Sequence, residues 1–193
     1  MRVVLASHNS GKLAELRALL STTDLSVESQ ADHNVPSAEE TGLTFVENAL
    51  IKARAVAQAT NLAAIADDSG LVVPALEGAP GIHSARYAGT HGDDEANNAK
   101  LIQDLKGIDD RRAYFFCAMV FMRHPADPTP LIATAAWHGE IIDAPQGTRG
   151  FGYDPHFFLP SLGIASAELE ATQKNKLSHR GQATAALLLK LAR

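Results

Sequence analysis

The sequence predicts an α/β fold built on a mixed sheet. Short apolar runs typical of buried strands alternate with segments whose apolar residues recur at helical spacing. Two long β-like runs, 113–122 and 130–142, are joined by a proline-rich turn, which predicts an antiparallel hairpin within that sheet. A length of 193 residues fits one domain with room for two lobes.

The N-terminal part of the chain sets this alternating pattern. Residues 2–7 predict a buried strand, residues 12–21 an amphipathic helix and residues 24–29 a second short strand. The segment from Thr44 to Glu47 is a capping-box signature, which predicts a helix that runs to about residue 60.

The pattern continues along the rest of the chain. A short apolar strand over 63–66 is predicted to stop at the polar segment 67–70, and a strand resumes over 71–75. Residues 93–106 predict a helix. The last helix is predicted to start near Ser178, as its N-cap, and to run to the end of the chain.

Composition excludes several classes of protein. The chain is 46% hydrophobic and 20% charged, yet it has no apolar run near the ~20 residues that span a bilayer. Its formal charge of −5 argues against a general nucleic-acid binder. The single cysteine, Cys117, lies in an apolar run and is expected to be a buried thiol, and the residues after Met1 lack a signal-peptide pattern, so we expect a cytoplasmic location.

The first strand leads into a small polar loop, Ser7-His8-Asn9-Ser10-Gly11-Lys12, and then into a helix that Asn9 or Ser10 is placed to cap. A helix start offers free N–H groups and the positive end of the helix dipole, and Lys12 adds charge, so the segment suits a phosphate. The alternative is an ordinary turn that binds nothing. It is not a Walker loop, because Ala6 replaces the first glycine and Leu13 follows the lysine.

Two acidic pairs are candidate metal ligands. Glu39-Glu40 precedes Thr41-Gly42 in a predicted loop, where a solvated acidic turn is the alternative. Asp67-Asp68 follows the buried strand over 63–66, and carboxylate oxygens suit Mg²⁺ that also contacts substrate phosphates. The alternative for this pair is an Asx-type turn in which Gly70 supplies a positive φ.

Three further segments carry candidate contacts. Lys52 lies in a helix with an alanine-rich face, which indicates close packing, so its side chain is expected to point along a cleft. The alternative is that Lys52 lies on a solvent-exposed face of the helix. Phe151 lies in the glycine-rich stretch 147–152, where its ring either stacks on a base or anchors the core. The segment from Lys174 to Gly181 concentrates basic side chains near the start of the last helix. The helix dipole disfavours positive charge there, which indicates a functional demand, and a solvated basic turn is the alternative.

Taken in order, these motifs resemble the inosine/xanthosine triphosphate pyrophosphatases over nearly the whole chain. The motifs are Ser7 to Lys12, Glu39 to Gly42 with Thr44-Phe45 and Glu47-Asn48-Ala49, Asp67 to Leu71, Gly78 to Gly81 with Ser84 to Tyr87, Gly150 to Pro155, and Ser178 to Gly181. Many members of that family carry Thr-Gly-Asn where this chain has Ser7-His8-Asn9, which leaves the role of His8 open.

The resemblance implies a single pyrophosphatase domain over residues 1–193, with a long sheet, flanking helices and two lobes separated by a cleft. It also implies a homodimer and Mg²⁺-dependent hydrolysis of ITP, dITP and XTP to the monophosphate and pyrophosphate, which cleanses the nucleotide pool. A nucleic-acid polymer and a membrane are not expected as partners.

The resemblance also assigns roles to residues. Asp68 is expected to accept the proton of the attacking water, or to orient that water if Mg²⁺ lowers its pKa. Glu40 and Asp68 are the expected metal ligands, with Glu39 and Asp67 as alternatives. The expected substrate contacts are Ser7, His8, Asn9, Ser10, Gly11, Lys12, Lys52, Ser69, Phe151, Gly152, Tyr153, Asp154, Lys174, His179 and Arg180.

Within that set, Arg180 and His179 are expected to donate to the 6-keto oxygen of hypoxanthine or xanthine, and Phe151 to stack on the base. Adenine would leave such donors unpaired. Three rival functions remain: a pyrophosphatase for pyrimidine or modified nucleotides, a nucleotide-binding regulatory module without turnover, and a phosphotransferase.

Overall fold

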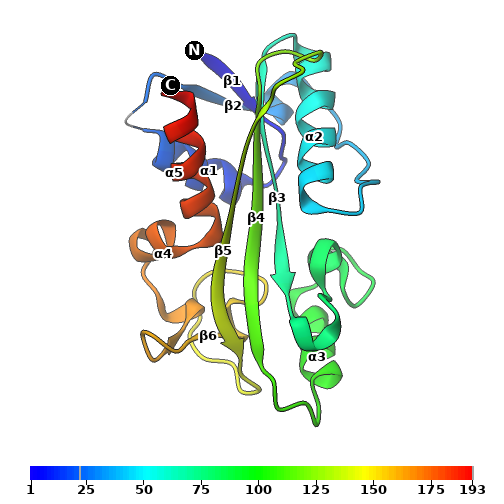
Figure 1. The fold of residues 1–193 in the computed structure, drawn as a ribbon, viewed down its shortest axis with the longest axis vertical. Helices are drawn as coiled ribbons and strands as arrows, with labels where there is room; N and C mark the ends of the chain where they lie inside the picture. The colour runs from blue at the N-terminus through cyan, green and yellow to red at the C-terminus, as the bar shows by residue number, and fades with distance from the viewer. Residues whose placement is uncertain (22, 193) are drawn as a thin grey trace. The chain divides into compact units, whose positions relative to one another are not determined.

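The structure is a computed structural model that describes residues 1–21 and 23–192, with only the backbone described at Ser10. Its strands and helices alternate along most of the chain (Figure 1). In chain order they are β1 (Arg2–Leu5), α1 (Ser10–Leu20), β2 (Ser26–Ser29), α2 (Phe45–Thr60), β3 (Ala63–Val72), α3 (Asp94–Asp104), β4 (Arg112–Met122), β5 (Leu131–Ile141), β6 (Phe157–Leu159), β7 (Ile164–Ala165), α4 (Ala171–Leu177) and α5 (His179–Leu191).

The strands form one sheet in the order β2-β1-β3-β4-β5-β6-β7. β1 pairs in parallel with β2, with Val3 opposite Val27, and in parallel with β3, with Leu5 opposite Ile65. β6 is antiparallel to both β5 and β7. The sheet is therefore mixed and carries flanking helices, as the sequence predicted.

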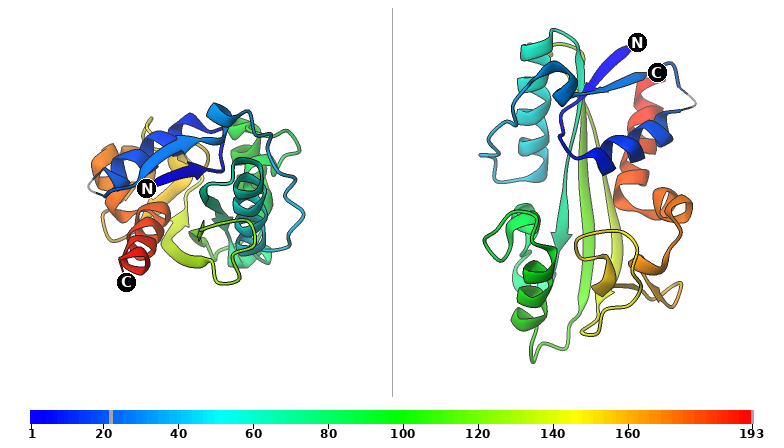
Figure 2. Two further views of the ribbon diagram at one scale, coloured as in Figure 1. Left: turned by 90° about the horizontal axis from the view of Figure 1, so that it is seen from above. Right: turned by 180° about the vertical axis from the view of Figure 1, so that it is seen from behind.

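The chain divides into two compact units. Unit 1 comprises Met1–Asp68, Cys117–Ala135 and Arg180–Arg193, and unit 2 comprises Ser69–Phe116 and Ala136–His179. In unit 1, α1 and α5 lie on one face of the strands and α2 on the other (Figures 1 and 2). The core on the first face joins Leu16 of α1, Ile65 of β3 and Leu187 of α5.

Unit 2 has a core of its own, rich in aromatic rings. Phe115 of β4 lies 4.7 Å from Phe157 of β6 between ring centroids, and Trp137 of β5 lies 5.4 Å from Phe157. Leu101 and Leu105, at helical spacing along and just after α3, are fully buried in the same cluster. This core fixes the loops on which the candidate residues of unit 2 lie.

Local capping explains where the first helices begin. The Asn9 side chain accepts a hydrogen bond from the backbone N–H of Lys12. Of the two predicted caps, Asn9 and Ser10, Asn9 is therefore the one that caps α1. Thr44 caps α2 by accepting from the N–H of Glu47, and the Glu47 carboxylate accepts from Leu43 and from the Thr44 hydroxyl. The predicted cap of α2 is therefore confirmed.

The predicted break between residues 66 and 71 is wrong. β3 runs without interruption through Asp67, Asp68, Ser69 and Gly70, so the acidic pair lies within a strand and not in an Asx turn. Gly70 is not in the positive-φ region. A Cβ at this position would lie 2.5 Å from the carbonyl oxygen of Gly81, so the glycine is needed for close packing and not for a turn.

The last helix begins near Ser178, as predicted, but the segment before it differs from the prediction. A separate short helix, α4, precedes α5, and Lys174 lies within α4 and not at the start of the last helix. Ser178 ends α4 as its C-cap, and α5 begins at His179. The end of the predicted helix at Arg193 lies outside the described residues.

The structure also bears on the state of Cys117 and on the presence of a membrane-spanning helix. Cys117 is fully buried, as predicted, and burial, together with the nearby charge of Asp67, raises the pKa of its thiol to about 12. Among the helices that the structure describes, none is both long enough and apolar enough to cross a membrane.

Leu187→Ala tests the core of unit 1. Leu187 is 2% exposed in the cluster under α1 and α5, so its truncation is expected to lower the free energy of unfolding by about 2 to 5 kcal/mol. Leu189→Ala is the matched control, since Leu189 lies on the same helix and is 69% exposed, and it should change stability by no more than about 0.5 kcal/mol. Urea denaturation measures both, and equal effects would contradict the assigned core.

Candidate functional site

The polar loop after β1 leads directly into the N-terminus of α1. The Asn9 N–H donates to the Ser7 hydroxyl oxygen at 3.1 Å, and the Asn9 side chain caps the helix. His8 and Asn9 are exposed, and the side chain of Ser10 lies outside the described part of the structure. The loop therefore presents the capped, solvent-accessible N-terminus of α1, a helix of 11 residues. The positive end of the helix dipole lies there and favours an anion.

Asp67 is the centre of a buried ion-pair cluster in unit 1. Its Oδ2 atom accepts from Lys12 Nζ at 2.9 Å and from Arg180 Nε at 3.2 Å, and Arg180 Nη1 also pairs with Glu15 at 2.8 Å. Burial alone raises the pKa of Asp67, but the charges of Lys12 and Arg180 outweigh burial and hold that pKa well below its usual range. Asp67 is therefore ionised and fixes two cationic side chains.

Asp68 belongs to a second cluster on the α2 side. Lys52 Nζ donates to Asp68 Oδ1 at 2.7 Å and to Glu40 Oε1 at 2.8 Å, so one ammonium bridges the two carboxylates. Consecutive residues of a strand point to opposite faces of the sheet. Asp67 accordingly meets residues of α1 and α5, whereas Asp68 meets a residue of α2.

The two bridged groups differ in their electrostatic balance. Burial raises the pKa of Asp68, and the charge of Lys52 only partly offsets this effect. Burial lowers the pKa of Lys52, but the charges of Asp68 and Asp67 more than compensate and the net shift is upward. Lys52 thus stays protonated, while Asp68 is a stronger proton acceptor than an ordinary aspartate.

The carboxylates of Glu40 and Asp68 fit a divalent cation. Both place an oxygen within 2.8 Å of the same ammonium nitrogen, so they converge on one point, and hard oxygen ligands suit Mg²⁺. Glu39 is exposed and takes no part in the bridge, and Asp67 is held by Lys12 and Arg180. Among the described residues no group of three or more His, Cys, Asp or Glu side chains is placed to hold a metal.

In unit 2, the glycine-rich loop is organised around Asp154. This buried carboxylate accepts from the Phe151 N–H at 2.9 Å, from the Ser166 hydroxyl at 2.8 Å and from Lys174 Nζ. Lys174 Nζ also lies 5.0 Å from the centroid of the Phe151 ring, which is 56% exposed. Asp154 therefore positions Lys174 and Phe151 and presents the ring to solvent.

The other predicted contacts of unit 2 are more deeply placed. Tyr153 is buried, and its hydroxyl donates to the Ser84 carbonyl oxygen at 2.8 Å, so Tyr153 and not Phe151 anchors the core. His179 is buried and stacks on Phe115 at 4.9 Å between ring centroids. Ser69 is half-buried in β3, and Gly152 donates its N–H to Asp94 at 2.6 Å.

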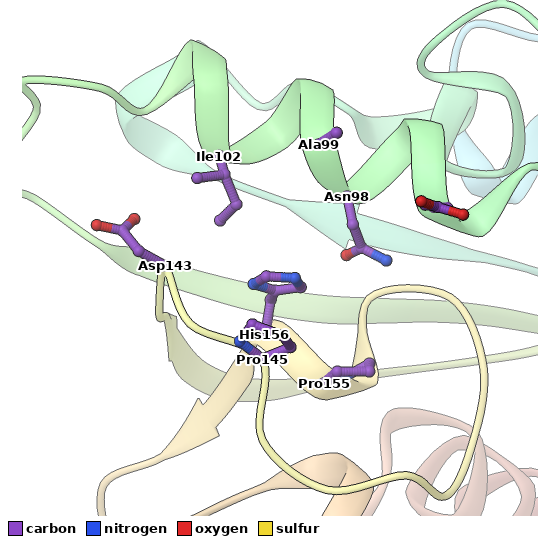
Figure 3. Close-up of a pocket in the computed structure, with 8 residues that line it drawn as sticks. Asn98, Ala99, Ile102, Asp143, Pro145, Pro155 and His156 are labelled. Atoms are coloured by element: carbon purple, nitrogen blue, oxygen red, sulfur yellow. The ribbon is translucent and has the colours of Figure 1, made fainter.

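A pocket of about 440 Å³ in unit 2 involves none of the predicted residues. Figure 3 shows Asn98 and Ile102 projecting from α3 toward the segment that carries His156. The lining residues are Glu95, Asn98, Ala99, Ile102, Asp143, Pro145, Pro155 and His156. The pocket has no lysine or arginine in its lining, so it does not suit a polyphosphate.

Sequence reasoning assigned no role to two residues that hold the charged clusters of unit 1. Glu15 pairs with Arg180 across 165 residues, and Asn48 donates to Asp68 across 20 residues. Glu15 gives no signal in the sequence, since a glutamate in an amphipathic helix is ordinarily solvated. Asn48 does give one, because it lies four residues before Lys52 and therefore on the same face of α2.

Comparison of the whole chain with known proteins identifies its family. The model of the Ham1 family matches residues 3–190. A protein of Burkholderia pseudomallei named dITP/XTP pyrophosphatase is 54% identical over 193 residues, covering 98% of this chain and 93% of that protein. A protein of the same name from Shigella flexneri is also 54% identical, over 97% of this chain and 96% of its own length.

Solved structures agree with the sequence comparison. A HAM1 protein from Coxiella burnetii superposes with a TM-score of 0.94 at 47% identity, covering 100% of this chain and 98% of the other. The Ham1 protein of Staphylococcus aureus superposes with a TM-score of 0.91 at 41% identity and the same coverage. By family model, by identity over nearly its full length and by fold, the chain belongs to the Ham1 family.

Proposed function

We propose that this protein hydrolyses dITP, XTP and ITP to the nucleoside monophosphate and pyrophosphate. The names of the relatives support this activity. The observation that carries it is the bridge from Lys52 to Glu40 and Asp68, which gathers one cation and two carboxylates in unit 1, beside an ion pair that also holds Lys12. A triphosphate needs this combination of positive charge and metal ligands.

Lys12, Lys52 and the N-terminus of α1 would bind the phosphates. The backbone N–H groups at the start of α1 would supply oriented donors, and the two ammonium groups would neutralise charge. In the structure each lysine pairs with carboxylates, Lys12 with Asp67 and Lys52 with Glu40 and Asp68. These ion pairs hold the two partly buried lysine side chains in place, so little side-chain freedom is lost when phosphate binds.

Glu40 and Asp68 would hold Mg²⁺, which supplies charge neutralisation at the phosphate oxygens. Asp68 would orient the attacking water at the α-phosphorus and accept its proton. Its burial in β3 and its fixed hydrogen bond to Lys52 support this role. The leaving pyrophosphate would then be released from the lysines.

We propose base contacts in each unit and describe the two sets in turn. In unit 2, the exposed ring of Phe151 is suited to stack on a base, and Lys174 and Asp154 fix its loop. In unit 1, Arg180 would donate to the 6-keto oxygen that hypoxanthine and xanthine share. In unit 2, His179 is a second proposed donor to the base. A hydrogen-bonding site of this kind rejects adenine because its donors would lose their acceptor.

A nucleotide panel tests the proposal directly. The protein is incubated with Mg²⁺ and ITP, dITP, XTP, GTP, ATP or dTTP, and the products are identified by anion-exchange chromatography. Monophosphate and pyrophosphate from ITP, dITP and XTP are expected. Release of diphosphate and orthophosphate, preferred cleavage of dTTP, or binding without turnover would overturn the proposal.

Three further features belong to the same proposal. The family resemblance supports a single pyrophosphatase domain, a homodimer and a cytoplasmic location. Light scattering coupled to size-exclusion chromatography tests the homodimer, with about twice the chain mass of 20.5 kDa expected.

Asp68→Asn is expected to reduce kcat for dITP by about 10²-fold or more, because the amide keeps the volume but cannot accept the proton. Steady-state kinetics measure the change, and circular dichroism checks the fold. If the folded variant retains wild-type turnover, Asp68 is not the proton acceptor.

Asp67→Asn tests the buried cluster. It leaves Lys12 and Arg180 without their shared carboxylate, so the free energy of unfolding should fall by about 3 to 5 kcal/mol near neutral pH. Because the folded pKa of Asp67 is lowered, its stabilisation is complete above the unfolded pKa of about 4 and is lost as pH falls below that value.

The stability difference between wild type and Asp67→Asn should therefore be constant from about pH 5 to about pH 8 and should shrink below about pH 4. Asp143→Asn is the control, since Asp143 pairs with Arg111 at 2.9 Å but its side chain is 65% exposed. That variant should change stability by no more than about 1 kcal/mol. A difference that grows on acidification would contradict the assigned ion pairs.

A further inference from the structure

Asn48 joins the loop that carries Glu40 to the strand that carries Asp68. It lies in the first part of α2 and is 1% exposed. Its Oδ1 atom accepts from the backbone N–H of Gly42 at 2.8 Å, and its Nδ2 atom donates to Asp68 Oδ2 at 3.4 Å. Only one orientation of the amide can satisfy both partners, since one is a donor and the other an acceptor.

Gly42 is required for this contact. A Cβ at Gly42 would lie 2.7 Å from Asn48 Oδ1 and 2.6 Å from the Cβ of Glu47, closer than real side chains approach. Gly42 has no positive φ, so the constraint is the close approach of its backbone to α2 and not its conformation. Glu40 lies two residues before this fixed point.

Lys52 and Asn48 act on different atoms of Asp68. Lys52 binds Oδ1, and Asn48 binds Oδ2, so the two donors fix the plane of the carboxylate as well as its position. An ammonium attracts carboxylates from many directions, whereas an amide hydrogen bond is directional. Lys52 therefore brings Glu40 and Asp68 together, and Asn48 sets how they face each other.

We propose that Asn48 and Gly42 form a positioning pair that sets the spacing and orientation of Glu40 and Asp68 for metal binding and turnover. The inference rests on the function proposed above and extends it to two residues outside the predicted substrate contacts. A neutral amide suits this position, since it accepts from the loop and donates to the strand without adding charge beside Asp68. An error of about 1 Å at such a position can cost about 10²-fold in rate.

Asn48→Asp separates the two hydrogen bonds. The new carboxylate has the same shape and can still accept from Gly42, but it cannot donate to Asp68 and repels it. We expect kcat for dITP to fall by about 10- to 100-fold, with KM changed by no more than about threefold.

Asn97→Asp is the matched control for that variant. Asn97 is also a buried helical asparagine, with Oδ1 accepting from the Ala88 N–H at 2.8 Å and Nδ2 donating to the Ala85 carbonyl oxygen at 3.3 Å. Its substitution makes the same chemical change without touching a carboxylate of the site. We expect kcat within about twofold of wild type, with thermal denaturation comparing the cost in stability of the two variants.

Gly42→Ala supplies a measurement that does not depend on turnover. The added methyl should push the loop away from α2 and separate Glu40 from Asp68. Mn²⁺ binding without nucleotide, followed by electron paramagnetic resonance, should weaken by about fivefold or more. Gly139→Ala is the control, because its Cβ would be equally crowded, 2.5 Å from the Phe158 carbonyl oxygen, in unit 2.

The outcomes distinguish the inference from the proposed function. If the wild-type protein fails to hydrolyse dITP, the proposed function itself fails. If it hydrolyses dITP but does not bind Mn²⁺ without nucleotide, the inference fails. If the wild type does both, the inference is overturned by an unchanged kcat in Asn48→Asp, by an equal loss in Asn97→Asp, or by Mn²⁺ binding that Gly42→Ala leaves unchanged.

Discussion

The architecture of unit 1 depends on the burial of two adjacent carboxylates in the middle of a strand. An isolated ionised carboxylate cannot be buried without a large free-energy penalty, so each must find a cation. Asp67 takes Lys12 and Arg180 from α1 and α5, and Asp68 takes Lys52 from α2. The same ion pairs thus attach α1 and α5 on one face, and α2 on the other, to β3. They also hold three cationic side chains beside the strand, all of them largely buried.

Much of the fold could be predicted from local patterns. Periodicity and capping located α1, α2, α3 and the long strands β4 and β5 to within a few residues. The patterns failed where the local signal was weak or misleading. α4 has only seven residues, too few for a clear period, and Asp67 to Gly70 carries turn residues although it is strand. The ion pairs that keep these residues in β3 come from 55 and 113 residues away, so no local window contains the reason.

The candidate site shows the same division. Residue types and motif order predicted Lys12, Lys52, Asp68 and a glutamate of the Glu39-Glu40 pair, because polyphosphate chemistry demands cations and oxygen ligands. They were not sufficient to separate Glu40 from Glu39, since neighbouring residues in a loop differ only in how the backbone turns them. Glu15 and Asn48 were assigned no role because each acts on a charged side chain of the site. The spacing of Asn48 from Lys52 was a usable signal, whereas Glu15 offered none.

The position of Cys117 has a practical consequence. It is the only cysteine in the chain, it is fully buried in β4, and its raised pKa keeps the sulfur as an unreactive thiol at ordinary pH. The native protein is therefore already a suitable background for site-specific labelling. A cysteine introduced at an exposed position would be the sole target for a maleimide dye or spin label, and no residue of the core would have to be replaced beforehand.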